Sequence, residues 1–168
     1  MRLSSTITVS VKATLDTDLA IVRPAAATSY VDAAGYTNGT GAAQADRIYQ
    51  ARRSVADSST PEVLPLSSGL VDALGNALSF ASITTILVKN RSATAGEVLT
   101  VGGGTHPLAA WLSSAGAGVK VGPGGRFLID NPSAAAYAVA AGSADKLTIS
   151  ADAGGDVPFD VIIQGRSA

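Results

Sequence analysis

The chain has 168 residues, a formal net charge of −1, and charged side chains at 15% of its positions. This length suits one domain with a substantial core, and this charge balance gives no broad electrostatic attraction to nucleic acid or to an anionic membrane. Because the sequence contains no cysteine, disulfides, thiol chemistry and cysteine-ligated zinc are excluded.

The chain combines few charged residues with a positive mean hydropathy of +0.29, which is unusual for a soluble protein that acts alone. Either part of the surface is buried against other subunits, or the many alanines raise the average. Apolar runs such as residues 86–88 and 161–163 fall far short of the roughly 18 residues that span a bilayer. The N-terminus also lacks the apolar run of a secretory signal, so we expect neither a membrane span nor Sec-type export.

The first predicted strand covers residues 6–12. Ile7, Val9 and Val11 alternate there with threonine, serine and lysine, a period of two that predicts a half-buried strand. The Ala-, Pro- and Gly-rich segment 23–45 follows, and we expect it to become ordered only on assembly with a partner. Within it, Asn38-Gly39 predicts a tight turn, since both residues tolerate positive φ.

Residues 44–55 are the most polar segment, and their pattern fits a strand better than a helix. Residues 62–70 alternate loosely and contain Pro65, which predicts an edge strand because proline cannot donate to a ladder. Residues 70–75 end at a glycine and predict either one helical turn or a tight corner.

The second half of the chain has the clearer strand pattern. Residues 83–89 form an apolar run that predicts a strand covered on both faces. The last strand, where Phe159, Val161 and Ile163 alternate with polar residues, should lie between neighbouring strands, since an exposed apolar edge favours aggregation. Further strands are expected at residues 97–101, 119–121, 127–129, 137–139 and 146–150.

Short strands spaced about 8–12 residues apart predict an all-β fold, an antiparallel β-sandwich of jelly-roll type. We expect residues 79–168 to form the sandwich core. Residues 1–78 should add strands and an extended interaction arm to the same structural unit.

Arg47, Arg52 and Arg53 form the one basic cluster, with Tyr49 among them. Three interpretations stay open: a weak nucleic-acid patch, a solvated strand face, or pairing between subunits, for which arginine is well suited. Together with Trp111, the sole tryptophan, these residues are the candidate interaction residues.

Catalytic and metal-binding patterns are sparse. His106 is the only histidine, and a surface-loop position is the simplest interpretation of it. The run 102–105 resembles a phosphate loop without the following lysine, so a turn is favoured. Acidic turns at 16–18 and 152–156 offer calcium ligands without an EF-hand pattern, and a glycosidase carboxylate pair stays an open alternative. We therefore expect no catalytic residues, no cofactor and no metal.

Several segments, taken in order, resemble small structural proteins encoded among the head genes of tailed bacteriophages. The resemblance starts near residue 37 and rests on short, turn-like motifs in residues 37–47, 92–103, 122–128, 131–132, 137–139, 142–147 and 159–165.

This resemblance implies a virion protein that decorates or cements the capsid, is made in the bacterial cytoplasm, and acts without enzymatic activity. Its implied partners are the major capsid protein and further copies of itself, as a homotrimer, with no nucleic acid or membrane. A head-fibre, tail, or receptor- or glycan-binding component is the alternative. For a glycan-binding component, Trp111 and Tyr137 should be exposed beside polar groups. An enzyme would need His106 in a pocket within reach of Asp or Ser.

Overall fold

The computed structural model describes residues 2–17, 21, 24–56, 60–152 and 155–168. These described residues form strands and turns and contain no helix, so no membrane-spanning helix is found among them. The strands are β1 (Ser5–Asp16), β2 (Ala25–Tyr36), β3 (Arg47–Val55), β4 (Glu62–Pro65), β5 (Leu70–Val71), β6 (Ala77–Leu78), β7 (Ser82–Asn90), β8 (Leu99–Gly102), β9 (Gly118–Val121), β10 (Arg126–Asp130), β11 (Tyr137–Ala138), β12 (Lys146–Ala151) and β13 (Val157–Arg166).

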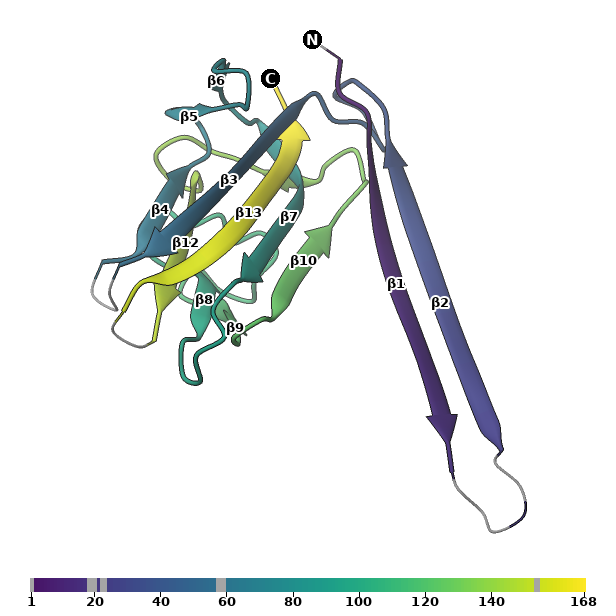
Figure 1. Cartoon of the computed structure of the whole chain (residues 1–168). Coiled ribbons are helices and arrows are strands. Elements are labelled where there is room, and N and C mark those ends of the chain that lie inside the picture. Colours follow the sequence, from purple (N-terminus) through teal and green to yellow (C-terminus); the bar gives the residue numbers. More distant parts are fainter. Residues whose placement is uncertain (1, 18–20, 22–23, 57–59, 153–154) are drawn as a thin grey trace.

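Two antiparallel sheets make up the body of the molecule. One has the order β10-β7-β13-β3, with β11 pairing to the end of β7, and the other has the order β4-β12-β8-β9. The strands β1 and β2 pair only with each other and project from this body as a long hairpin (Figure 1). A second, small hairpin is formed by β5 and β6.

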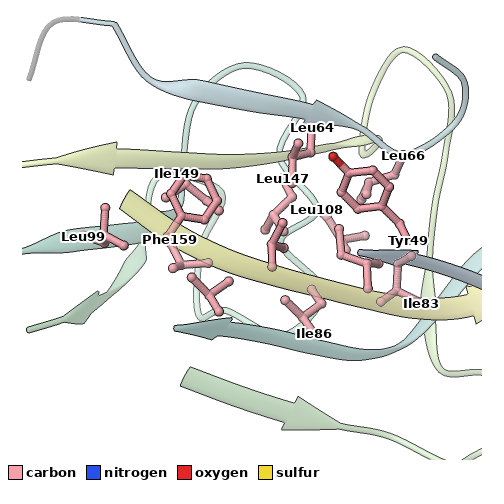
Figure 2. Packing of buried hydrophobic residues seen from close by; sticks show 14 of the residues in the cluster. Tyr49, Leu64, Leu66, Ile83, Ile86, Leu99, Leu108, Leu147, Ile149 and Phe159 are labelled. Carbon is pink, nitrogen blue, oxygen red and sulfur yellow. The ribbon is translucent and has the colours of Figure 1, made fainter. Parts of the chain in front are cut away.

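The core lies between the two larger sheets. Along β13, Phe159, Val161 and Ile163 point inward and are fully buried, and β12 contributes Leu147 and Ile149 from the facing sheet. Figure 2 shows Phe159, Leu147 and Ile149 among the side chains that meet between the strands. The alternation of apolar and polar residues is therefore satisfied by packing of one sheet on the other, as in a sandwich.

The pairing of the sandwich strands is nested in sequence. β8 pairs with β9, β7 with β10, β4 with β12 and β3 with β13, so the innermost pair is adjacent in the chain and the outermost pair is the most distant. β13 also pairs with β7 through a register shift at Gly165, where a Cβ would lie 2.3 Å from the carbonyl oxygen of Ser82. Glycine is required there because the two backbones approach so closely.

Several sequence predictions are confirmed. The chain is all-β, residues 47–55 form a strand rather than a helix, and β13 lies between β7 and β3. The segment with Pro65 forms β4 at a sheet edge, and residues 70–78 form a hairpin corner rather than a helical turn. Strands β3 and β4, from the predicted first part of the chain, pair with β13 and β12 of the second part.

One prediction about the first 45 residues was wrong. β1 is a strand, but it is not half-buried, because its residues are exposed from Thr8 to Asp16 and Val11 remains 54% exposed. The segment 23–45 contains β2, which pairs with β1 along its whole length, and its ordering only on assembly stays a prediction. Arg23, at the start of that segment, lies outside the described residues.

Candidate interaction surface

The hairpin formed by β1 and β2 is the largest feature outside the sandwich. Its pairing is unbroken from Ser5 opposite Tyr36 to Asp16 opposite Ala25. Twelve residues per strand, at about 3.4 Å each, give it a reach of roughly 40 Å. The hairpin can therefore contact surfaces well beyond the sandwich from which it projects (Figure 1).

The two faces of the hairpin differ in chemistry, because residues opposite each other in the register share a face. One face, called here the apolar face, carries Ile7, Val9, Val11, Ala13, Leu15, Ala26, Tyr30 and Ala34. Asp32 is the only charged residue on it. The other face carries mainly threonine, serine and alanine, with Val31, Lys12 and Asp16.

Much of the exposed apolar surface of the molecule belongs to this region. Of the nine large apolar side chains that are exposed among the described residues, six lie between residues 9 and 31: Val9, Val11, Leu15, Ile21, Tyr30 and Val31. Such a concentration on one projecting element is typical of a surface that binds another protein. An isolated two-stranded hairpin is also only marginally stable in water, which favours a covered state.

The root of the hairpin is held on the sandwich by side-chain hydrogen bonds. The Tyr36 hydroxyl donates to Asp130 Oδ1 at 2.6 Å, and Thr85 Oγ1 donates to the same oxygen at 2.7 Å. Ser5 Oγ donates to Gln164 Oε1 at 2.5 Å. Burial, followed by the hydrogen bond to Asp130, raises the pKa of Tyr36 above its usual range, so the phenol remains a donor.

A buried arginine supports the turns beside this root. Arg166 is 1% exposed, and its guanidinium donates to the carbonyl oxygens of Gln44, Ala134 and Ser133 at 2.9, 2.7 and 2.9 Å. These bonds join the turn that follows β2 to the loop that follows β10. The position of the hairpin is thus fixed from both sides of its root.

The outer face of the β10-β7-β13-β3 sheet changes in character with distance from the root. The first cross-strand row, Asp130, Thr85 and Gln164, receives the root hydrogen bonds. The second row, Leu128, Leu87 and Ile162, is apolar and only half-buried. The third row is charged and consists of Arg126, Lys89, Asp160 and Arg52.

A groove of about 570 Å³ separates the hairpin from this outer face. Residues 5–9 of β1 form one wall, and the apolar row together with Ile48 forms much of the floor. Arg126 is the only charged residue that lines it. No ion pair of Arg126 is found within the described part of the chain.

The predicted arginine cluster is divided by the structure. Arg52 pairs with Asp160 at 2.8 Å on the outer face, whereas Arg53 pairs with Glu62 of β4 at 2.5 Å. Arg47 lies 3.4 Å from Asp46. The hydrogen bond from Arg52, helped by Arg91, holds the pKa of Asp160 below its usual range. The three arginines therefore have partners within the chain and do not form one basic patch.

The aromatic candidates lie in or against the core. Tyr49 is 3% exposed and receives a hydrogen bond from Arg53 at 2.9 Å. Trp111 is half-buried and packs on Phe127 with 5.1 Å between ring centroids, and its buried indole N–H has no hydrogen-bond partner in the described part of the chain. Tyr137 is half-buried against the same core. None of these rings offers an open stacking platform.

The remaining chemical candidates stay apart from one another. His106 is exposed in a loop at φ 54°, and its carbonyl accepts bonds from the amides of Asp145 and Lys146. Asp152 pairs with Lys120 at 2.6 Å. Asp18 and residues 153–154 of the acidic turns lie outside the described residues. Within the described ranges, no group of three or more potential metal-ligating residues is found.

Sequence reasoning missed the groove, although a signal for it was present. Within residues 83–89 the run 86–88 is apolar in both phases of its alternation, which predicts a strand covered on both faces at Leu87. In the structure its outward side is covered only in part. Comparison of the chain with protein-family models, with curated proteins and with solved structures gave no match.

Proposed function

We propose that this chain is a structural protein of the virion of a tailed bacteriophage, where it decorates the capsid and cements neighbouring major capsid subunits. The observation that carries the proposal is the hairpin, which combines a reach of roughly 40 Å with an uncovered apolar face. The sequence resemblance to head-associated phage proteins supports the same role. A cement protein acts by surface contact, and no covalent chemistry is required of it.

We further infer that the sandwich is a jelly roll. In that fold a long antiparallel double strand is wound around the core, so its strands pair as a nested series. The pairs β8 with β9, β7 with β10, β4 with β12 and β3 with β13 match such a series. The jelly roll is common in viral capsid proteins, which agrees with the proposed role.

The geometry suits cementing because the hairpin is long and its root is fixed. A hairpin held by Tyr36 and Ser5 presents its apolar face in one direction, so less ordering entropy is lost when it binds a neighbour. On a symmetric shell many copies bind together, and modest contacts per copy add up through multivalency.

The proposed partners are the major capsid protein and further copies of this chain, as a homotrimer. The proposed location is the capsid surface, after synthesis in the bacterial cytoplasm. The role involves no cofactor, nucleic acid or membrane. The alternative of a head-fibre, tail, or receptor- or glycan-binding component differs in where the hairpin docks. The partly buried Trp111 does not favour the glycan version.

Expanded shells that lack this chain provide the test. Purified wild-type protein is added to shells of the major capsid protein from the same phage, and a variant with a trimmed hairpin, in which an Asn-Gly turn joins Val9 to Asp32, is added in parallel. We expect the wild type to bind and to raise the resistance of the shells to heat and low salt, and the trimmed variant to do neither. Shells that remain equally labile with and without the wild type would overturn the proposal.

A further inference from the structure

We propose that the groove between the hairpin and the sheet is filled by the hairpin of a second copy of this chain. The inference deepens the self-association included in the proposed function and rests on that part alone. It assigns the contact between copies to two surfaces: the hairpin of one copy, and the outer face of the β10-β7-β13-β3 sheet of the other.

The walls of the groove define what fits into it. On one side lie Ile7 and Val9 of β1, and on the other lie Leu87, Leu128 and Ile162 of the sheet. Both sides are apolar, extended and made of strands. A matching occupant is therefore a flat ribbon with few charges, because stacked strands pack at about 10 Å and exclude water between their side chains.

The chain itself supplies such a ribbon. The hairpin has two strands with a continuous register, and its apolar face includes Val11 at 54% and Tyr30 at 55% exposure. Its opposite face, rich in threonine and alanine, has charges only at Lys12 and Asp16 among the described residues. The hairpin of the same copy does not fill the groove, because residues 5–9 form its wall and are fixed there by the bond from Ser5 to Gln164.

Charge complementarity also favours a second copy. The groove is lined by one charged residue, Arg126, and the apolar face of the hairpin carries one, Asp32. Within the described part of the chain neither side chain has an ion pair. Asp32 lies opposite Val9, at the inner end of the free ribbon, so full insertion of a hairpin from another copy brings this carboxylate to the mouth of a groove whose single charge is positive. This arrangement penalises a partner with a basic ribbon.

The area available is sufficient for a stable contact. Beyond the groove wall, residues 10–16 and 25–31 leave a free ribbon of seven residues per strand, about 24 Å long and about 10 Å wide, with a face of roughly 240 Å². Covering that face removes a similar area on the partner, so two reciprocal insertions bury roughly 1,000 Å², the lower limit for a specific interface. Each copy has one hairpin and one groove, so insertion closes either as a reciprocal dimer or as a ring such as a trimer.

The mass of the free protein tests the inference without any shell. We expect size-exclusion chromatography with light scattering to give a dimer or trimer at micromolar concentration. V11D should weaken the association at least tenfold, because it places a charge on the apolar face. V71D is the matched control, because Val71 is 55% exposed on β5 and lies outside the groove. A monomeric wild type, or equal weakening by V71D, would overturn the inference.

Cross-linking identifies the surfaces involved. Because the sequence has no cysteine, a Tyr30→Cys chain can be mixed with a Leu128→Cys chain and treated with a short thiol cross-linker. We expect a cross-linked pair of different chains, and no such product when Val71→Cys replaces Leu128→Cys. If instead one chain carrying both cysteines becomes linked only within itself, the hairpin covers its own sheet and the inference is wrong.

The two proposals can fail separately. A protein that associates through the groove but does not protect shells would retain this inference and overturn the cementing role. A monomer that protects shells would retain the cementing role and overturn this inference.

Discussion

The sandwich and the hairpin are built from the same sequence pattern and reach different outcomes. In β13 the alternating Phe159, Val161 and Ile163 are fully buried against the opposite sheet. In β1 the alternating Val9 and Val11 remain 41% and 54% exposed. A period of two therefore reports the strand and its apolar face, but whether that face meets the same chain or another molecule depends on the layers around it.

The comparison predicts that core truncations and hairpin truncations differ sharply in their effect on stability. Phe159→Ala should lower the free energy of unfolding by about 3–5 kcal/mol, because it removes a fully buried ring and leaves a cavity in the central strand. Val11→Ala, on the exposed face, should change it by no more than about 0.5 kcal/mol in the dissociated protein. Urea denaturation of the two variants measures the difference, and a similar loss for both would show that the hairpin contributes to the fold of the single chain.

The junction between the two regions should be sensitive at Arg166. Arg166→Met leaves the three carbonyl acceptors without their donor inside the protein, which should lower the free energy of unfolding by about 3 kcal/mol. Arg52→Ala is the control, since its pair with Asp160 is mostly exposed and should contribute less than about 1 kcal/mol. Amide exchange near residue 44 should become faster in Arg166→Met only, and unchanged exchange there would contradict the role given to this arginine.

A smaller and pH-dependent effect is expected at Tyr36. Tyr36→Phe removes the hydrogen bond to Asp130, while Thr85 still donates to that carboxylate, so we expect a loss of about 1 kcal/mol near neutral pH. Because burial and Asp130 raise the pKa of Tyr36, the stabilisation is complete below the unfolded value of about 10 and is lost as the pH rises beyond it. The wild type should therefore lose stability more steeply than Tyr36→Phe above pH 10. Parallel pH profiles of the two proteins would refute this.

Much of the sandwich was predictable because its signals are local. The alternation in residues 159–163 identified β13, and Pro65 identified an edge strand through its missing N–H. β2 was not predictable in the same way. Its Ala-rich sequence has low strand propensity, and it forms a strand through full pairing with β1, a tertiary context that outweighs propensity.

The candidate interaction surface was harder to predict, since it depends on distant contacts. Tyr36 and Asp130 are 94 residues apart, and Arg166 and Gln44 are 122 apart, so no sequence pattern joins them. The arginines 47, 52 and 53 are close in sequence, yet strand alternation and separate carboxylate partners divide them. Clustering along the chain was therefore a poor guide to clustering on the surface.

The smallest change in the stability of the single chain is expected for the trimmed variant, although it removes the most residues. The trimmed variant, with Asn-Gly between Val9 and Asp32, retains the root contacts of Ser5 and Tyr36 and loses residues 10–31, which lie beyond those contacts. At the lowest protein concentrations its free energy of unfolding should match that of the wild type within about 0.5 kcal/mol. At higher concentrations the wild type alone should become more stable, because association through the hairpin favours the folded state by mass action.

Urea titrations over a range of protein concentrations separate the stability of the single chain from the stabilisation that association adds. A trimmed variant that is less stable than the wild type at every concentration would mean that the hairpin contributes to the fold of the single chain. A wild type whose free energy of unfolding does not change with protein concentration would mean that the hairpin does not bind a second copy of this chain.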